Sequence, residues 1–241
     1  MEKKEEILQK LSQVYDPELD QSVTEMGFIE DIFMDGTDVT IYFRLPTYWC
    51  SPNFAYIMAE DMRDRVLEIP WVSSVEIALK DHCAAEQVNQ GVTQGKTFSE
   101  VFSDLSGGNL EELRQKFRVK TFLSRQEYLM RHLLGTQMTH AEMAAASLGE
   151  VEQWPLLGTE GKHLLERYRK IRRELGHSCD PDQRAFIKAD GSLIEPEQFS
   201  AYLLEARRTR LSMEFNAHYC RGLLETRYAV EMGPLQGGKQ S

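Results

Sequence analysis

The stretch LPTYWCSPNFAYIMAEDMRDRVLEI, residues 45–69, places a cysteine just before a strongly patterned helix. Ser51 suits the N-cap of that helix, and Pro52 suits its first position. Apolar residues then recur every three or four positions, which predicts a single core-facing stripe made of Phe54, Met58, Met62, Val66 and Ile69. We expect the helix to end before Pro70.

Strand patterns lie on both sides of this helix. Before it, MGFIEDIFM (26–34) and VTIYFRL (39–45) flank Asp35-Gly36, which predicts an antiparallel hairpin. After it, SSVEIALK (73–80) alternates apolar and polar residues and predicts a third strand. An amphipathic helix begins the chain. The order α-β-β-α-β therefore predicts a small α+β domain with a three-stranded sheet.

The rest of the chain has a different character. The segment after the third strand is rich in Gln, Asn, Ser and Gly, as is typical of a linker, and the patterns beyond it are mostly helical. We therefore predict a first domain at residues 1–88 and a linker at 89–108. A mainly α-helical domain follows at 109–235, with a flexible tail at 236–241.

Composition indicates the cellular compartment and argues against a membrane partner. Hydrophobic residues make up 41% and charged residues 27% of the chain, and no apolar run approaches the ~18 residues of a membrane span. The charged N-terminus lacks the pattern of a signal peptide, so we expect a cytoplasmic protein with no membrane partner. The four cysteines are then expected to be reduced thiols.

Charge is divided unevenly along the chain. Residues 1–90 contain 7 Lys and Arg against 18 Asp and Glu, whereas the remainder contains 21 against 20. This asymmetry favours two units with different surfaces. The acidic first unit argues against a nucleic-acid backbone as its partner.

Cys50 is the most informative single residue. A thiol before a helix N-terminus faces unpaired N–H groups and the positive end of the helix dipole, which favour the thiolate that binds soft metals. Burial as a small apolar residue at a strand-to-helix corner is the structural alternative. For Asp16, which precedes a proline, the alternative to a functional role is a helix-ending Asx turn.

Several motifs near Cys50 follow one another in a set order: Asp16-Pro17-Glu18-Leu19, Met26-Gly27-Phe28-Ile29, Asp35-Gly36, Val39-Thr40-Ile41 and Leu45-Pro46-Thr47. Their order and spacing across roughly residues 4–80 resemble the SufT/PaaD-like iron–sulfur assembly family. Members of that family commonly have Cys-Pro, whereas Ser51 here separates Cys50 from Pro52.

The resemblance implies a small non-enzymatic factor that helps iron–sulfur clusters reach recipient proteins. It assigns Cys50 as the functional thiol and metal ligand, with Asp16 and Glu18 as supporting acidic residues. The cofactor it implies is an iron–sulfur cluster or iron, bound transiently.

Other side chains are weaker candidate ligands. Cys83 follows the third strand and would give a two-thiolate site if it lay at the same sheet end as Cys50. His177 and Cys179 share a loop and are residue types that bind zinc or iron. The His218-Tyr219-Cys220 motif is weaker still, because positions two apart on a helix face different directions.

Three functional interpretations follow. The leading one is an accessory maturation factor that delivers iron–sulfur clusters or metal to a dedicated client metalloenzyme, which the helical domain selects. PaaD-like relatives accompany multicomponent oxygenases, so the resemblance implies an oxygenase component as client. The alternatives are an interaction or regulatory subunit without metal chemistry, and an enzyme with a site between the domains that uses His177, Cys179 or His140. A homo-oligomer stays open.

Overall fold

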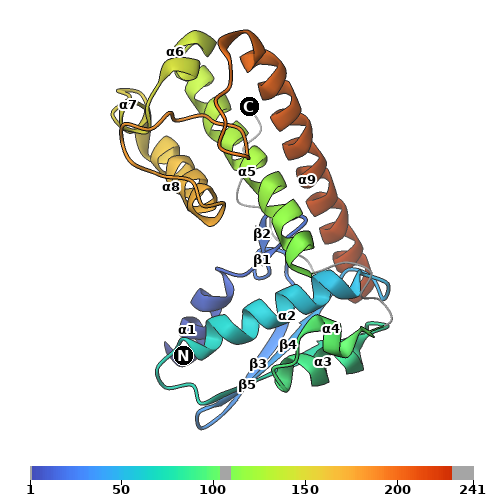
Figure 1. The fold of residues 1–241 in the computed structure, drawn as a ribbon. Helices are drawn as coiled ribbons and strands as arrows, with labels where there is room; N and C mark the ends of the chain where they lie inside the picture. Colours follow the sequence, from blue (N-terminus) through green and yellow to red (C-terminus); the bar gives the residue numbers. More distant parts are fainter. Residues whose placement is uncertain (1, 104–109, 230–241) are drawn as a thin grey trace. The chain divides into compact units, whose positions relative to one another are not determined.

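The structure of this chain, a computed structural model, describes residues 2–103 and 110–229 (Figure 1). It divides into two compact units. The first unit comprises residues 1–113 and 214–241, and the second unit comprises residues 114–213. The described residues form a mixed sheet and many helices, which confirms the α+β class.

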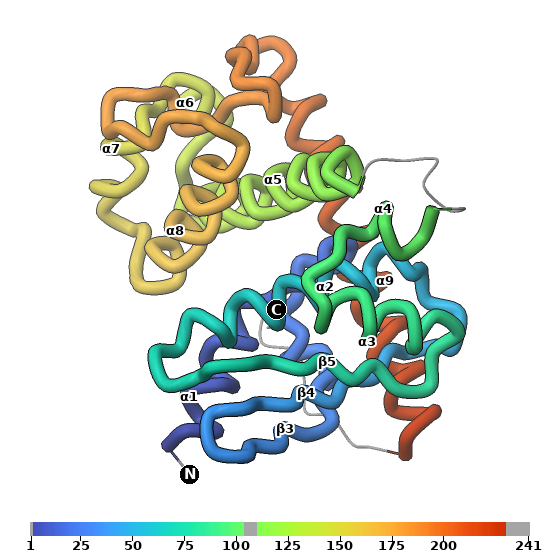
Figure 2. Tube along the Cα trace, turned by 60° about the horizontal axis from the view of Figure 1, so that its bottom comes forward, coloured from blue at the N-terminus to red at the C-terminus, as the bar shows by residue number. Residues whose placement is uncertain are grey.

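The first unit contains the predicted α-β-β-α-β order with two short additions. Its three-stranded sheet has the order β3-β4-β5, in which β3 and β4 are antiparallel and β4 and β5 are parallel (Figure 2). Strands β1 and β2 pair separately. The bounds are α1 (Glu2–Leu11), β1 (Tyr15–Asp16), β2 (Gln21–Ser22), β3 (Ile29–Asp35), β4 (Asp38–Arg44), α2 (Pro52–Leu67), β5 (Ser74–Lys80), α3 (Ala85–Thr93) and α4 (Phe98–Val101).

Helix α2 and the sheet form the core that the residue periodicities predict. Alternate side chains of β4 and β5 are buried, and so is the stripe of α2. The buried members are Val39, Ile41, Phe43, Val75, Ile77, Leu79, Met58, Met62 and Val66. Ser51 is the N-cap residue and Pro52 begins the helix, as expected. Gly36 has a φ of 63° in the β3–β4 turn, a conformation that favours glycine.

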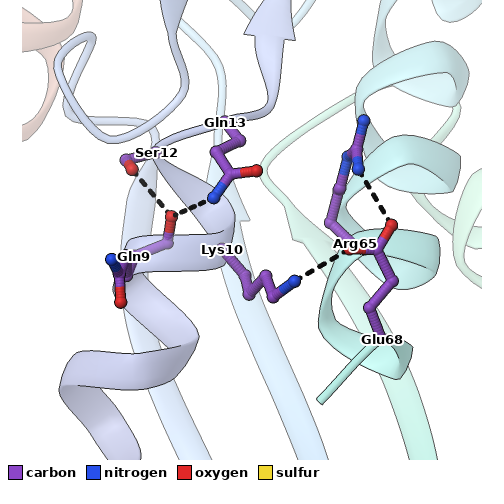
Figure 3. Close-up of polar contacts among 6 residues, drawn as sticks. All are labelled: Gln9, Lys10, Ser12, Gln13, Arg65 and Glu68. Carbon is purple, nitrogen blue, oxygen red and sulfur yellow. Dashed lines mark hydrogen bonds and ion pairs between the residues drawn. The ribbon is translucent and has the colours of Figure 1, made fainter.

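Polar contacts join α1 to the end of α2 (Figure 3). Lys10 Nζ lies 2.9 Å from a carboxylate oxygen of Glu68, which also pairs with Arg65 at 2.9 Å. The last turn of α1 is closed by Ser12 and Gln13, whose side chains donate to the Gln9 carbonyl oxygen at 2.8 and 3.4 Å. These contacts are largely exposed, so the buried Ile7 and Leu11 hold α1 in place.

The segment expected to be a linker, residues 89–108, was also expected to contain a short helix near Phe98, and α4 is that helix. The segment differs from a linker because it is packed: Val92, Phe98 and Phe102 are buried in the core of the first unit together with Val88 of α3. The Tyr56 hydroxyl donates to the Lys96 carbonyl oxygen at 2.5 Å. A Cβ at Gly91 would lie 2.5 Å from Val101 and 3.0 Å from the Tyr56 oxygen, so this glycine permits close packing.

The second unit is mainly helical. Its core is made of apolar side chains from helices and loops between residues 122 and 203. Buried polar groups join them: the Gln126 amide donates to Tyr168 at 2.8 Å and to the Ile187 carbonyl at 2.9 Å. Its helices are α5 (Leu110–Gly135), α6 (His140–Ala145), α7 (Leu148–Glu152), α8 (Gly158–Glu174), η2 (Pro196–Gln198) and α9 (Phe199–Tyr228), of which α5 begins and α9 ends in the first unit.

The last part of α9 is the second difference from the expected domain limits. Ala217 and Leu224 are buried in the core of the first unit, and Cys220 and Tyr228 pack against it. The expected helical domain at 109–235 is therefore divided. The expected tail at 236–241 lies outside the described residues.

Within residues 2–103 and 110–229, no helix combines the length and the apolar character needed to cross a membrane.

Candidate thiol site

Two loops leave the sheet at the same end. Strands β4 and β5 are parallel, with Arg44 opposite Lys80, so the Cys50 loop (residues 45–50) and the His82 loop (residues 81–84) start side by side. Two hydrogen bonds join them: the Cys83 N–H donates to the Tyr48 carbonyl oxygen at 3.0 Å, and the ring of His82 bonds the Cys50 carbonyl oxygen at 2.7 Å.

Cys50 is partly buried and lies two residues before α2. Its sulfur is 3.3 Å from the Thr47 hydroxyl oxygen, which is its neighbour within the loop. Ser51 occupies the N-cap, where its carbonyl accepts the N–H groups of Phe54 and Ala55 but its side chain makes no capping bond. The thiol is therefore held at the entrance of the helix rather than at the cap itself.

His82 acts as a neutral clamp on the Cys50 loop. Its Nδ1 accepts the Ala84 N–H at 3.1 Å, so Nε2 carries the proton and donates to the Cys50 carbonyl oxygen. Burial lowers the pKa of His82 below its ordinary value of 6.5, and the charge of Arg227 lowers it further, against the opposite effect of the bond to Cys50. The ring is therefore uncharged at neutral pH.

Asp16 is a buried carboxyl group, only 7% exposed. Its Oδ1 accepts the N–H groups of Glu18 at 2.8 Å and Leu19 at 3.1 Å, so an Asx turn is present. It does not end a helix as expected, because α1 ends at Leu11 and Asp16 lies in β1. Burial raises the pKa of Asp16 to about 7, and the charge of Glu18 also raises it, whereas the two N–H bonds lower it. The carboxyl group is thus divided between its two protonation states near neutral pH.

The end of α9 connects the two loops. Arg227 donates from one guanidinium nitrogen to the Leu45 carbonyl oxygen at 3.2 Å and from another to the Asp81 carbonyl oxygen at 2.7 Å. Earlier in the helix, Arg221 donates to the Glu25 carbonyl oxygen at 2.8 Å. The C-terminal helix is therefore a structural part of the candidate site.

Cys220 of this helix is partly buried against the apolar core of the first unit. Burial raises the pKa of its thiol to about 12, and the charge of Asp16 acts in the same direction. The thiol is therefore protonated at neutral pH. The end of α9 and the start of the chain thus share one hydrophobic core.

The family comparison agrees with the motifs around Cys50 and Asp16. Residues 4–78 match the iron–sulfur cluster assembly protein family. The resemblance is therefore confirmed for this assembly domain, and it supports a role in iron–sulfur cluster assembly. An uncharacterized protein of Methanocaldococcus jannaschii is 29% identical over 88 residues, which are 36% of this chain and 90% of that protein. No solved structure shows a significant match.

The other predicted ligands are exposed or have other partners. Cys83 is exposed, and its N–H rather than its thiol contacts the Cys50 loop. His177 bonds the Ala189 carbonyl oxygen at 2.9 Å, and the Cys179 sulfur lies 3.5 Å from the Arg169 carbonyl oxygen. Among the residues that the structure describes, no three His, Cys, Asp or Glu side chains form a metal-holding group.

Sequence reasoning missed the contribution of α9 to the assembly domain. The pattern was present, because Ala217, Cys220 and Leu224 recur at the spacing of one helix face. That spacing predicts a packed face without naming its partner. The two arginine contacts to backbone carbonyls carry no local sequence signal.

Proposed function

We propose that the chain is an accessory maturation factor that passes an iron–sulfur cluster or iron to a client metalloenzyme through Cys50. The observation that carries this proposal is the position of the Cys50 thiol, which lies beside the Thr47 hydroxyl on a loop that the His82 ring bonds, within the region that matches the assembly family. Thiolate sulfur is the usual protein ligand of iron–sulfur clusters. The cluster is cargo here, so binding at Cys50 is transient.

The Cys50 loop also offers a surface for recognising a partner. Trp49 is 78% exposed, and its ring meets that of Tyr48 edge-on with the ring centroids 4.8 Å apart. Exposed aromatic side chains of this kind commonly anchor protein contacts. We propose that they contact the client while the neighbouring thiol holds the cargo.

We assign selection of the client to the second unit. The family match ends at residue 78, and the second unit has a hydrophobic core of its own. A separately cored addition to an assembly domain fits a dedicated client better than general cluster supply. An oxygenase component is the client class that the PaaD-like resemblance favours.

The test compares client proteins isolated from strains that carry wild-type protein, Cys50→Ser or Cys179→Ser. Iron and acid-labile sulfide in the client should fall severalfold with Cys50→Ser, because the cargo-binding thiol is lost. Cys179→Ser is the matched change in the second unit and should leave the client loaded. Client metal and activity that stay normal with Cys50→Ser would rule out the proposed delivery.

A second function is favoured by Ser51, which occupies the cap position between Cys50 and Pro52. A chain that has kept the fold without the metal chemistry would be an interaction or regulatory subunit. Affinity capture of the client by Cys50→Ser protein separates the two cases. Intact capture with an unloaded client supports delivery, whereas intact capture with a fully active client supports the regulatory subunit.

A further inference from the structure

The three-stranded sheet of the first unit has an inner face and an outer face. Side chains alternate between the two faces along each strand, and the inner side chains of β4 and β5 are buried in the core. The residues between them point to the outer face. There the register places Phe33 of β3 opposite Thr40 of β4, and Thr40 opposite Glu76 of β5, in one row across the sheet.

Phe33 is a large apolar side chain that the fold leaves exposed to solvent. It is 58% exposed, whereas its neighbour Ile32, which points to the inner face, is buried. A single exposed ring is common on protein surfaces and by itself indicates no function. The charges around this ring distinguish it.

Four carboxyl groups surround the Phe33 ring on the outer face. Asp31 and Asp35 lie two positions before and after it in β3. Asp38 lies opposite Asp35 in β4, and Glu76 lies in the same row as Phe33. All five side chains are exposed, and we call them the Phe33 face. Side chains paired across strands interact, so the ring lies within a strongly negative surface.

The salt bridges of the described residues leave most of this negative charge unbalanced. Lys4 Nζ lies 2.9 Å from a carboxylate oxygen of Asp31. Among residues 2–103 and 110–229, Asp35, Asp38 and Glu76 have no such cationic partner. Like charges directly opposite each other destabilise a strand pair, so Asp35 and Asp38 favour binding of a cation between them.

The other end of the outer face is already paired. Lys80 and Arg44 both form salt bridges with Glu30, at 3.1 and 3.6 Å. The Phe33 face lies towards the β3–β4 turn, whereas the Cys50 loop follows the opposite end of β4. The exposed acidic surface and the thiol are therefore at different ends of the sheet.

We propose that the Phe33 face docks a cationic segment of another protein, in which Lys or Arg side chains flank an apolar side chain. The apolar side chain covers the Phe33 ring, and the cations pair with the carboxylates around it. Complementary charge of this kind speeds encounter and fixes the orientation of the partner. The inference goes beyond the proposed function and does not depend on it, because a segment docked here leaves the Cys50 loop uncovered.

The same charges disfavour other occupants of this face. A second copy of the chain would bring identical carboxylates together, which costs affinity. The phosphates of nucleic acid and of an anionic membrane would also be repelled, because both partners are recognised by positive charge.

The first test titrates full-length protein with a short fluorescent peptide that contains Lys-Ser-Leu-Ser-Lys, and follows fluorescence anisotropy. In an extended chain the leucine and both lysines of this probe share one face. Wild type should bind it, and added salt should weaken binding. Phe33→Ser should weaken binding at least about tenfold, because loss of a central apolar anchor commonly costs that much.

Two controls separate the anchor from general attraction. Phe215→Ser changes the same residue type at another exposed position and should bind the peptide as wild type does. A peptide with serine in place of leucine keeps the charge and should bind wild type at least about tenfold more weakly. Failure of wild type to bind the leucine peptide, or equal binding of the two peptides, would overturn the proposal.

Paired charge variants test the carboxylates. Asp35→Asn/Asp38→Asn removes two charges from the Phe33 face and should weaken binding at least about tenfold and flatten its salt dependence. Glu160→Gln/Glu174→Gln removes two exposed charges from the second unit and should bind as wild type does. Equal weakening by the two double variants would show general attraction to an acidic protein and would overturn the proposal. Circular dichroism checks that each variant is folded.

A crosslink locates the bound peptide without changing the protein. A water-soluble carbodiimide joins a lysine of the peptide to the carboxylate beside it, and mass spectrometry identifies the linked residue. We expect links to Asp35, Asp38 or Glu76. Links that avoid the Phe33 face would overturn the proposal.

Two further measurements test the other occupants. Sedimentation velocity should show that Phe33→Ser leaves the oligomeric state unchanged; a wild-type dimer that this variant dissociates would assign the face to a second copy instead. Vesicles that contain phosphatidylserine should not bind, and binding that Phe33→Ser abolishes would assign the face to a membrane.

Failure of this inference can be told apart from failure of the proposed function. If Cys50→Ser unloads the client while Phe33→Ser binds the peptide normally, delivery stands and the docking face is wrong. If Phe33→Ser loses the peptide but Cys50→Ser leaves the client loaded, the docking face stands and delivery is wrong.

Discussion

Cys50 and Cys179 are both partly buried cysteines in loops next to helices, yet their surroundings differ. Both loops are fixed by side chains that donate to backbone carbonyls, His82 to Cys50 and Arg172 to Ser178. The Cys179 sulfur is packed against the apolar core of the second unit. The Cys50 loop, by contrast, is bonded by side chains from distant parts of the chain, His82 and, at the start of the loop, Arg227. Polar neighbours in the sequence therefore indicate a functional cysteine less reliably than the residues that tertiary packing places around it.

The comparison predicts that Arg172 has a purely structural role in the Cys179 loop. Arg172 is 2% exposed, and its guanidinium donates to the carbonyls of Ser178, Arg184 and Ala185 at 2.7–2.9 Å. Arg172→Ala leaves these acceptors without their charged donor, which should lower the free energy of unfolding by about 3–5 kcal/mol. Urea denaturation followed by circular dichroism measures the change.

Arg173→Ala is the matched control, because Arg173 is the exposed neighbour in the same helix. It should change stability by no more than about 0.5 kcal/mol. Hydrogen exchange should rise in the Cys179 loop of Arg172→Ala and stay unchanged in the Cys50 loop. Equal effects of the two arginine variants would show that Arg172 does not hold the Cys179 loop in place. The Cys50 and Cys179 loops could then no longer be compared as loops fixed in the same way.

The second prediction concerns the free energy that burial of the Asp16 carboxylate costs the first unit. Its folded pKa is about 7 against an ordinary value of 3.8, so the metal-free protein loses stability as pH rises from 3.8 through about 7. Asp16→Asn keeps an oxygen acceptor for the Glu18 and Leu19 N–H groups without the charge. It should raise the free energy of unfolding at pH 8 by about 2–4 kcal/mol, since one pKa unit corresponds to 1.36 kcal/mol.

Asp16→Ala controls for the hydrogen bonds, because alanine removes the acceptor as well as the charge. It should be less stable than Asp16→Asn at every pH. The measurement is urea unfolding at pH 4 and pH 8, where the difference between wild type and Asp16→Asn should be small at the lower pH. A difference that does not vary with pH would contradict the buried-carboxylate account.

The sequence predicts those parts of the fold that local periodicity encodes. The stripe of α2 and the alternation in β4 and β5 are regular over whole elements, so both elements and the hairpin at Gly36 are predictable. A short helix near Phe98 is predictable and is α4, but α3 and the packing of this segment are not, because Gly91 resembles a linker residue in sequence but serves close packing against Tyr56. Composition alone does not separate these two uses of glycine.

The candidate site is predictable only in part. Cys50, Asp16 and Glu18 follow from the motif order, and the shared sheet end follows once β4 and β5 are known to be parallel. Cys220 does not follow, because its contact with the first unit joins segments far apart in sequence. Amphipathic spacing gives a helix face but leaves open which surface covers it.

The third prediction tests whether the end of α9 stabilises the Cys50 loop and the His82 loop. Arg227→Met removes donors to the Leu45 and Asp81 carbonyls while keeping an unbranched apolar side chain. We expect a loss of about 1–2 kcal/mol in unfolding free energy, because these bonds are partly exposed. Alkylation of Cys50 and Cys83 by a maleimide should become faster, as followed by mass spectrometry.

Arg207→Met is the matched control for this substitution, since Arg207 is exposed in the part of α9 that belongs to the second unit. It should leave both alkylation rates unchanged. If Arg227→Met behaved like this control, the end of α9 would not support the Cys50 loop, and the contrast with the Cys179 loop would rest on the His82 contact alone.

The smallest expected effect concerns the clamp by His82, whose pH dependence has the opposite sign to that of Asp16. Because burial depresses the folded pKa of His82, the stability it contributes is present above 6.5 and is lost as pH falls through the folded pKa. His82→Asn removes this titration, so the stability of wild type relative to the variant should fall on acidification from pH 7 to pH 5. Thermal unfolding at both pH values measures it. A relative stability that rises on acidification would mean that the ring is charged in the folded protein, and the neutral clamp on the Cys50 carbonyl would have to be abandoned.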